Sequence, residues 1–138
     1  MEKYDFVING LPIPPLLVAA IRHGKWRPPS DPGLIRAVFG ETEPESPQFY
    51  DLASMVPQNR RLPERSVRQV YGEVVEGTSV GLNPRKAVYI GDLGIDKPIA
   101  LDYRRSLDDP RVLYLGQTGW VEVAESVHVL LRKLDLSN

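Results

Sequence analysis

Residues 87–124 read AVYIGDLGIDKPIALDYRRSLDDPRVLYLGQTGWVEVA, and this stretch decides the fold. It holds short apolar runs separated by loops rich in Gly, Pro and Asp, a pattern typical of successive strands. The runs are Ala87–Ile90, Ile99–Tyr103, Val112–Leu115 and Trp120–Val123. The connections between them are too short for a crossover helix, so neighbouring strands should pair antiparallel. The stretch therefore predicts a β-meander.

Side-chain alternation along these runs predicts two different faces of the sheet. The apolar face, which should pack against the core, is assigned Val88, Ile90, Ile99, Leu101, Tyr103, Leu113, Leu115, Val121 and Val123. The other face mixes polar and aromatic residues and is assigned Tyr89, Ala100, Asp102, Arg104, Val112, Tyr114, Trp120 and Glu122.

Helices are expected before and after the meander, because apolar residues recur there at spacings of three and four. Their expected ranges are Ile13–His23, Asp31–Gly40, Phe49–Leu62 and Ser126–Leu134. Gly24 and Gly40 should end the first two helices, and Pro57 should kink or end the third. The last helix should dock its apolar stripe on the apolar sheet face, since neither surface would persist exposed.

Two further segments complete the prediction for the fold. Gly40–Gln48 is interpreted as an exposed acidic loop, and Val70–Glu76 as an additional strand. Together these elements predict one α+β domain over residues 1–138, with a single sheet that is antiparallel or, as the alternative, mixed.

Composition excludes several classes of function. The 138 residues carry a formal net charge of −1, which gives no overall field to attract nucleic acid or an anionic membrane. The chain has no cysteine, so disulfides, thiolate metal sites and a cysteine nucleophile are excluded. No secretory signal is visible, and no segment approaches the ~18 apolar residues of a membrane span. We therefore expect a cytoplasmic protein without a membrane or nucleic-acid partner.

No motif in the chain points to catalysis. Gly91–Gly94 lacks the Lys-Ser/Thr of a phosphate-binding loop and is interpreted as a turn. The two histidines have no metal-ligand spacing, and the Asp residues form no calcium-loop pattern. The basic segment Asn59–Arg68 is interrupted by Glu64 and is interpreted as solvated surface. We expect no metal and no cofactor.

The order IGDLGIDKPIALDYR, then DDPRVLYL, then Trp120 followed by VAESVHVLLRKL, resembles the C-terminal half of the SUKH superfamily. This Smi/Knr-like domain is shared by fungal cell-wall synthesis regulators and many bacterial proteins. The resemblance is clearest over Gly91–Leu134, and IPPLLVAAIRHGKW is similar to the bacterial branch. That branch usually has acidic and aromatic residues early in the last helix, where this chain has Val127, His128 and Val129.

The resemblance implies a non-enzymatic protein-binding domain of the immunity type, one that binds and neutralises a cognate toxin. Two alternatives stay open: a SUKH-like regulatory protein without a toxin partner, and a small hydrolase or ligand-binding enzyme that uses the Asp-rich loops. The residues that match the family pattern are interpreted as fold determinants, so no catalytic residue is carried over.

The candidate partner surface is the polar and aromatic face of the sheet, because Tyr, Trp and Arg most often carry binding energy at interfaces. Its candidate residues are Tyr89, Asp102, Arg104, Arg105, Tyr114 and Trp120. The alternative is that the N-terminal helices cover this face and make it a second core layer. In that case the partner surface should lie on loops such as Gly40–Gln48 or Asn59–Arg68. The sequence indicates no oligomeric state.

Overall fold

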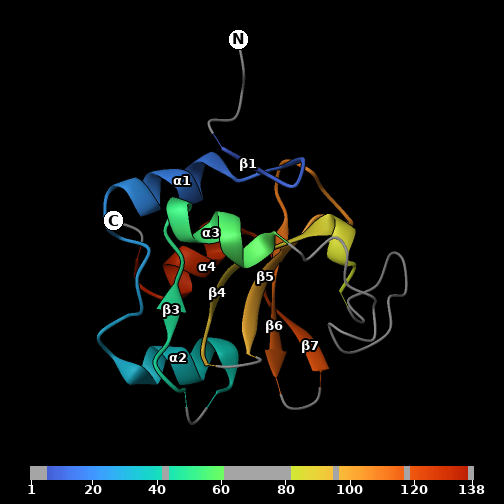
Figure 1. The fold of residues 1–138 in the computed structure, drawn as a ribbon. Coiled ribbons are helices and arrows are strands. Elements are labelled where there is room, and N and C mark those ends of the chain that lie inside the picture. Colours follow the sequence, from blue (N-terminus) through green and yellow to red (C-terminus); the bar gives the residue numbers. More distant parts are fainter. Residues whose placement is uncertain (1–5, 42–43, 61–81, 95–96, 117–118, 137–138) are drawn as a thin grey trace.

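The computed structural model describes residues 6–41, 44–60, 82–94, 97–116 and 119–136. These residues form the expected α+β fold, with one large and one small antiparallel sheet (Figure 1). In spatial order the strands of the large sheet are β3 (Gln48–Phe49), β4 (Ala87–Asp92), β5 (Pro98–Asp102), β6 (Arg111–Gly116) and β7 (Gly119–Ala124). The predicted meander is confirmed as β4 to β7, and since every pair is antiparallel the mixed alternative is wrong.

The small sheet is a hairpin that the sequence analysis did not predict. It joins β1 (Val7–Ile8) to β2 (Leu11–Pro12) through Asn9 and Gly10, both at positive φ. Asn-Gly is the dipeptide that favours this tight turn, because both residues tolerate the left-handed conformation. The Tyr103 hydroxyl donates to the Pro12 carbonyl oxygen at 2.7 Å, so the hairpin is anchored to the end of β5.

The helices begin and end where local chemistry predicts. They are α1 (Pro15–Arg22), α2 (Pro32–Phe39), α3 (Leu52–Asn59), the short 3₁₀ helix η3 (Pro84–Lys86) and α4 (Val127–Lys133). The side chains of Asp31 and Ser126 accept backbone N–H bonds at the starts of α2 and α4, as N-caps do. Gly24 and Gly40 follow α1 and α2 with φ of 71° and 73°, where a side chain would be strained.

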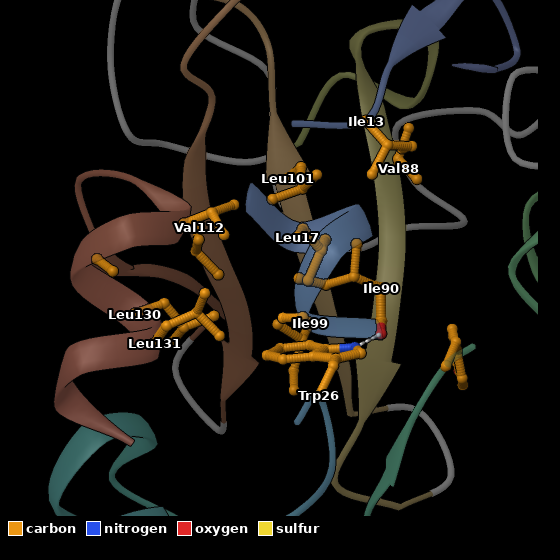
Figure 2. Close-up of a cluster of buried hydrophobic side chains, with 14 of the residues drawn as sticks. Ile13, Leu17, Trp26, Val88, Ile90, Ile99, Leu101, Val112, Leu130 and Leu131 are labelled. Carbon is orange, nitrogen blue, oxygen red and sulfur yellow. Dashed lines mark hydrogen bonds between the residues drawn. The ribbon is translucent and has the colours of Figure 1, made fainter. Parts of the chain in front are cut away.

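One face of the large sheet carries the main core (Figure 2). Helices α1 to α4 all contribute buried side chains to it, and Figure 2 shows Leu130 and Leu131 of α4 pointing toward the sheet. Trp26, between α1 and α2, packs in the same cluster and donates its indole N–H to the Ile90 carbonyl oxygen at 3.2 Å. The predicted docking of the last helix on an apolar sheet face is confirmed.

The two faces were predicted correctly for β4 and β5 but not for β6. Val112 and Tyr114, which were expected on the polar face, lie in the main core, and Leu113 and Leu115 lie on the opposite face. The reason is that β6 is buried on both faces, so its sequence is a continuous apolar run. Such a run has no alternation of polar and apolar residues to show which side chains point to which face. Pairing of Val112 with Leu101 sets the phase.

For β7, the expected faces are correct at Val123 and Trp120, but Val121 is exposed where a core position was expected. Val123 lies in the main core as expected, while Val121 is 39% exposed at the edge of the sheet. Trp120 lies on the second face, as expected.

The third helix is shorter than predicted, because Phe49 belongs to β3 and α3 ends at Asn59. Pro57 lies inside α3 and does not end it. Hydrogen bonds of Asn59 hold the end of α3 against β4: the buried Asn59 amide donates to the Met55 and Tyr89 carbonyl oxygens, and its Oδ1 accepts from the Tyr89 N–H. Asn59 thereby satisfies the edge of β4 beyond the two-residue β3.

Within the described part of the expected acidic loop, the prediction is wrong at Glu41 and at Gln48. Gln48 lies in β3, and Glu41 is buried. Glu41 accepts a hydrogen bond from the Tyr114 hydroxyl at 2.7 Å and pairs with Lys97 at 3.5 Å, which compensates its burial. The expected strand Val70–Glu76 and the expected surface segment beyond Arg60 lie outside the described residues.

Candidate functional site

The second face of the large sheet begins with a small apolar cluster. Its buried members are Leu82, Ala87, Ala100, Leu113, Leu115 and Trp120. Half-buried Tyr89 packs against them, and its ring stacks on that of Trp120 with centroids 6.4 Å apart. Most of this face is therefore buried as a second core layer, but the N-terminal helices that were expected to cover it in that case pack on the first face instead.

At the end of β5 the second face changes from apolar side chains to a buried charge cluster. Asp102 is fully buried and accepts hydrogen bonds from Arg104 Nε at 3.0 Å and from Arg111 Nε at 2.7 Å. A second donor of Arg111, Nη2, lies 2.6 Å from the same carboxylate. Both guanidinium side chains are themselves at most 3% exposed. The register explains the meeting, because Arg111 stands directly opposite Asp102 across the β5–β6 pair.

The charge cluster reaches the surface through Glu122 of β7. Arg111 Nη1 lies 3.3 Å from Glu122 Oε1, and Arg105 Nη1 lies 3.8 Å from the same oxygen. The Arg105 side chain is 54% exposed, so the second of these contacts is a weak surface ion pair. A chain of charges thus runs from a buried carboxylate to an exposed arginine.

The two arginines decide the charge of Asp102. Burial by itself raises the pKa of this carboxyl, but hydrogen bonds from Arg104 and Arg111 outweigh burial and hold its pKa below the usual range. Asp102 is therefore ionised and fully engaged as an acceptor. A carboxylate in this state holds the groups that donate to it in fixed positions.

The anchored structure is the loop between β5 and β6. Asp102 binds the second residue after β5 through the Arg104 N–H, at 3.1 Å, and the first residue of β6 through the Arg111 side chain. Inside the loop, the Asp109 N–H donates to the Ser106 hydroxyl oxygen at 3.0 Å. The loop presents Arg105 and Leu107 to solvent, and Leu107 is 55% exposed. A charged and an apolar side chain are thus displayed from a fixed backbone.

The structure brings together some of the predicted site residues and separates others. Asp102, Arg104 and Arg105 belong to the charge cluster, and Tyr89 and Trp120 stack on each other on the same face. Tyr114 is on the opposite face, where its ring packs edge-on against Phe39. Of the six, Arg105 is exposed and Tyr89 half-buried, and the others have buried side chains.

Sequence reasoning missed Arg111 and Leu107 as members of this region. Arg111 carried a usable signal, because it begins a run that is otherwise apolar and follows a turn from the strand that ends in Asp102. Leu107 carried a signal as well, as the one apolar residue in the polar segment RRSLDDPR.

Asp92, which lies within the glycine turn Gly91–Gly94, is also engaged by hydrogen bonds. Asp92 accepts from the Tyr50 hydroxyl at 2.6 Å and from the Gly94 N–H at 3.1 Å. Burial, and then the Asp92 carboxylate, raise the pKa of Tyr50. Among the described residues, no three His, Cys, Asp or Glu side chains gather as metal ligands would. None of the described helices is both long and apolar enough to cross a membrane.

Comparison with known proteins returned no matching family model, no matching curated protein and no matching solved structure.

Proposed function

We propose that this protein is a non-enzymatic protein-binding domain whose contact surface centres on the β5–β6 loop. The observation that carries the proposal is the combination of exposed Arg105 and Leu107 with a loop backbone clamped by buried Asp102. A loop that is already ordered loses little conformational freedom on binding, which favours affinity. Arginine is one of the residue types enriched at binding hot spots, and exposed Leu107 adds apolar area that a partner would bury.

We further propose that the partner is a toxin that this protein neutralises. This part of the proposal rests on the resemblance of residues Gly91–Leu134 to the bacterial SUKH proteins. The β5–β6 loop lies inside that stretch, so the proposed contact surface and the resemblance involve the same part of the chain. A cytoplasmic location is part of the same proposal, since the toxin would act there.

The test compares capture of a partner by the wild-type chain and by two loop variants, Arg105→Glu and Leu107→Asp. Each has a matched control at an exposed residue elsewhere, Arg85→Glu and Val56→Asp. Each protein is immobilised and exposed to a lysate of the source strain. The wild-type chain and the two controls should capture the same protein from it. The loop variants should bind it at least about tenfold more weakly, a difference of about 1.4 kcal/mol. All four variants should melt like wild type, because surface substitutions usually change stability by no more than about 0.5 kcal/mol.

Two results would contradict the proposal in different ways. Equal capture by loop variants and controls would mean that the contact surface lies elsewhere. A captured protein that is harmless when expressed alone, or equally harmful when co-expressed with the wild-type chain, would exclude toxin neutralisation.

A further inference from the structure

A groove lies on a different part of the surface from the β5–β6 loop, and the proposed partner contact does not involve it. It encloses about 880 Å³ between the connector from α1 to α2, the start of α2 and the end of α4. Figure 1 shows these elements, which come from distant parts of the sequence. This volume is within the usual range of ligand pockets, so the groove is large enough for a chain segment or a large ligand.

Both walls of the groove are fixed by local structure. On one side, Pro28 and Pro29 restrict the connector backbone, and the Asp31 carboxylate accepts from the Gly33 N–H at 2.9 Å. On the other side, α4 ends in a Schellman-type turn, in which the Leu136 N–H donates to the Leu131 carbonyl oxygen at 2.8 Å. The groove is therefore preformed in the unbound chain.

Two arginine side chains in the groove have unused binding capacity. Arg27 and Arg132 are exposed, and within the described part of the chain neither guanidinium forms an ion pair or hydrogen bond. The third cation, Lys133, differs because its ammonium donates to the Val123 carbonyl oxygen at 3.0 Å. Asp135 also lines the groove, yet it does not pair with either arginine. Two unengaged guanidinium groups therefore face one rigid groove.

Apolar side chains also line the groove. Leu34 and Leu136 line the groove and are partly exposed, as are the two prolines of the connector. A small inorganic anion would satisfy the arginines but leave this apolar surface in water. An extended peptide with alternating acidic and apolar side chains would use both kinds of surface, because guanidinium groups bind carboxylates bidentately.

We propose that this groove binds an extended acidic segment of another protein. The site is independent of the β5–β6 loop, and the basic side chains Arg27, Arg132 and Lys133 outnumber the carboxylates of Asp31 and Asp135 that also line it. It holds whether or not the proposed partner of the loop is a toxin.

The test measures fluorescence anisotropy of a labelled peptide of alternating glutamate and leucine, titrated with the full chain at low salt. Peptides with glutamine or lysine in place of glutamate serve as ligand controls, and free acetate serves as a small-carboxylate competitor. The protein variants are Arg27→Glu and Arg132→Glu, with Arg85→Glu as a matched control outside the groove. Capture of the loop's partner is measured on the same variants.

The wild-type chain and Arg85→Glu should bind the glutamate peptide equally, with an affinity that falls as salt is added. Each groove variant should bind it at least about tenfold more weakly, and the control peptides should not bind. Equal binding by all variants, equal weakening by Arg85→Glu, or displacement by dilute acetate would overturn the proposal. Normal capture of the loop's partner by the groove variants would show that the two sites are separate, so failure of one proposal would not be mistaken for failure of the other.

Discussion

The two faces of the large sheet are both buried, but different interactions bury them. The first face packs apolar side chains from all four α-helices into one continuous cluster. The second face has a smaller apolar cluster that gives way to Asp102 and its two arginines. Apolar packing stabilises in proportion to area, whereas a buried ion pair adds little net stability but is costly to break. The first face therefore accounts for the stability of the fold, and the second fixes the position of one loop.

The largest effect is expected from Leu131→Asp, which places an unpaired charge in the first face. Leu131 is 2% exposed on α4, and no cation among the described core residues stands ready to pair with the new carboxylate. We expect a loss above about 4 kcal/mol, enough to abolish cooperative unfolding in a small domain. Circular dichroism during thermal melting measures it. His128→Asp, at an exposed position of the same helix, is the control and should melt like wild type.

A soluble, cooperatively melting Leu131→Asp protein would contradict the packing of α4 on the sheet. It would also remove the contrast between the two faces, because the first face would then tolerate a charge as the second does.

The next effect concerns the charge cluster. Asp102→Asn removes the buried carboxylate that both Arg104 and Arg111 bind, and loss of one partner of a buried ion pair costs about 3–5 kcal/mol. Denaturant unfolding at neutral pH measures this loss. Asp109→Asn, in the same loop but exposed, should change stability by no more than about 0.5 kcal/mol.

The same carboxylate predicts how stability depends on pH. Its pKa is lower in the folded chain than the ordinary value of about 3.9, so its stabilising contribution is complete above that value. The contribution is lost as the pH falls through the folded-state pKa, because the unfolded chain then binds the proton more readily. Wild-type stability should therefore fall below about pH 4 by more than that of Asp102→Asn. Parallel pH profiles of the two proteins would contradict the lowered pKa.

A direct comparison of the faces uses Leu101→Ala and Leu113→Ala. Both leucines are fully buried, and they lie on neighbouring strands with their side chains on opposite faces. Each truncation leaves a cavity, for which losses of about 2–5 kcal/mol are usual. Leu101→Ala should be the larger loss, since a cavity surrounded by the larger cluster relaxes less. If Leu113→Ala lost more, the second face would be the more rigid of the two.

Local signals were sufficient for much of this architecture. The Asp31 and Ser126 caps, the ends at Gly24 and Gly40 and the meander itself all follow from chemistry within a few residues. These features need no knowledge of distant contacts.

What the sequence did not predict depends on contacts between distant segments. The phase of β6 follows from its pairing with β5, because the run of apolar residues fits either face. Glu41 is buried through Tyr114, 73 residues away, and nothing near Glu41 in the chain indicates this. In the candidate site, Asp102, Arg104 and Arg105 were predicted as neighbours, whereas the role of Arg111 needed the strand register.

The smallest expected effect is the coupling between Tyr89 and Trp120 on the second face. Their rings stack at 6.4 Å, with an angle of 24° between the ring planes, and aromatic pairs of this kind couple by about 0.5–1.5 kcal/mol beyond the area that they bury. A double-mutant cycle with Tyr89→Leu and Trp120→Leu measures the coupling directly, because the loss of buried area by each ring cancels in the cycle. We expect a value near the lower end of that range, since Tyr89 is only half-buried and water screens part of the interaction between the rings. The fully buried pair Leu101 and Val112 on the first face, which lie opposite each other on β5 and β6, provides the matched cycle with alanine substitutions. A coupling of Tyr89 to Trp120 larger than that of the first-face pair would mean that the aromatic contact, and not the charge cluster, is the main specific interaction of the second face.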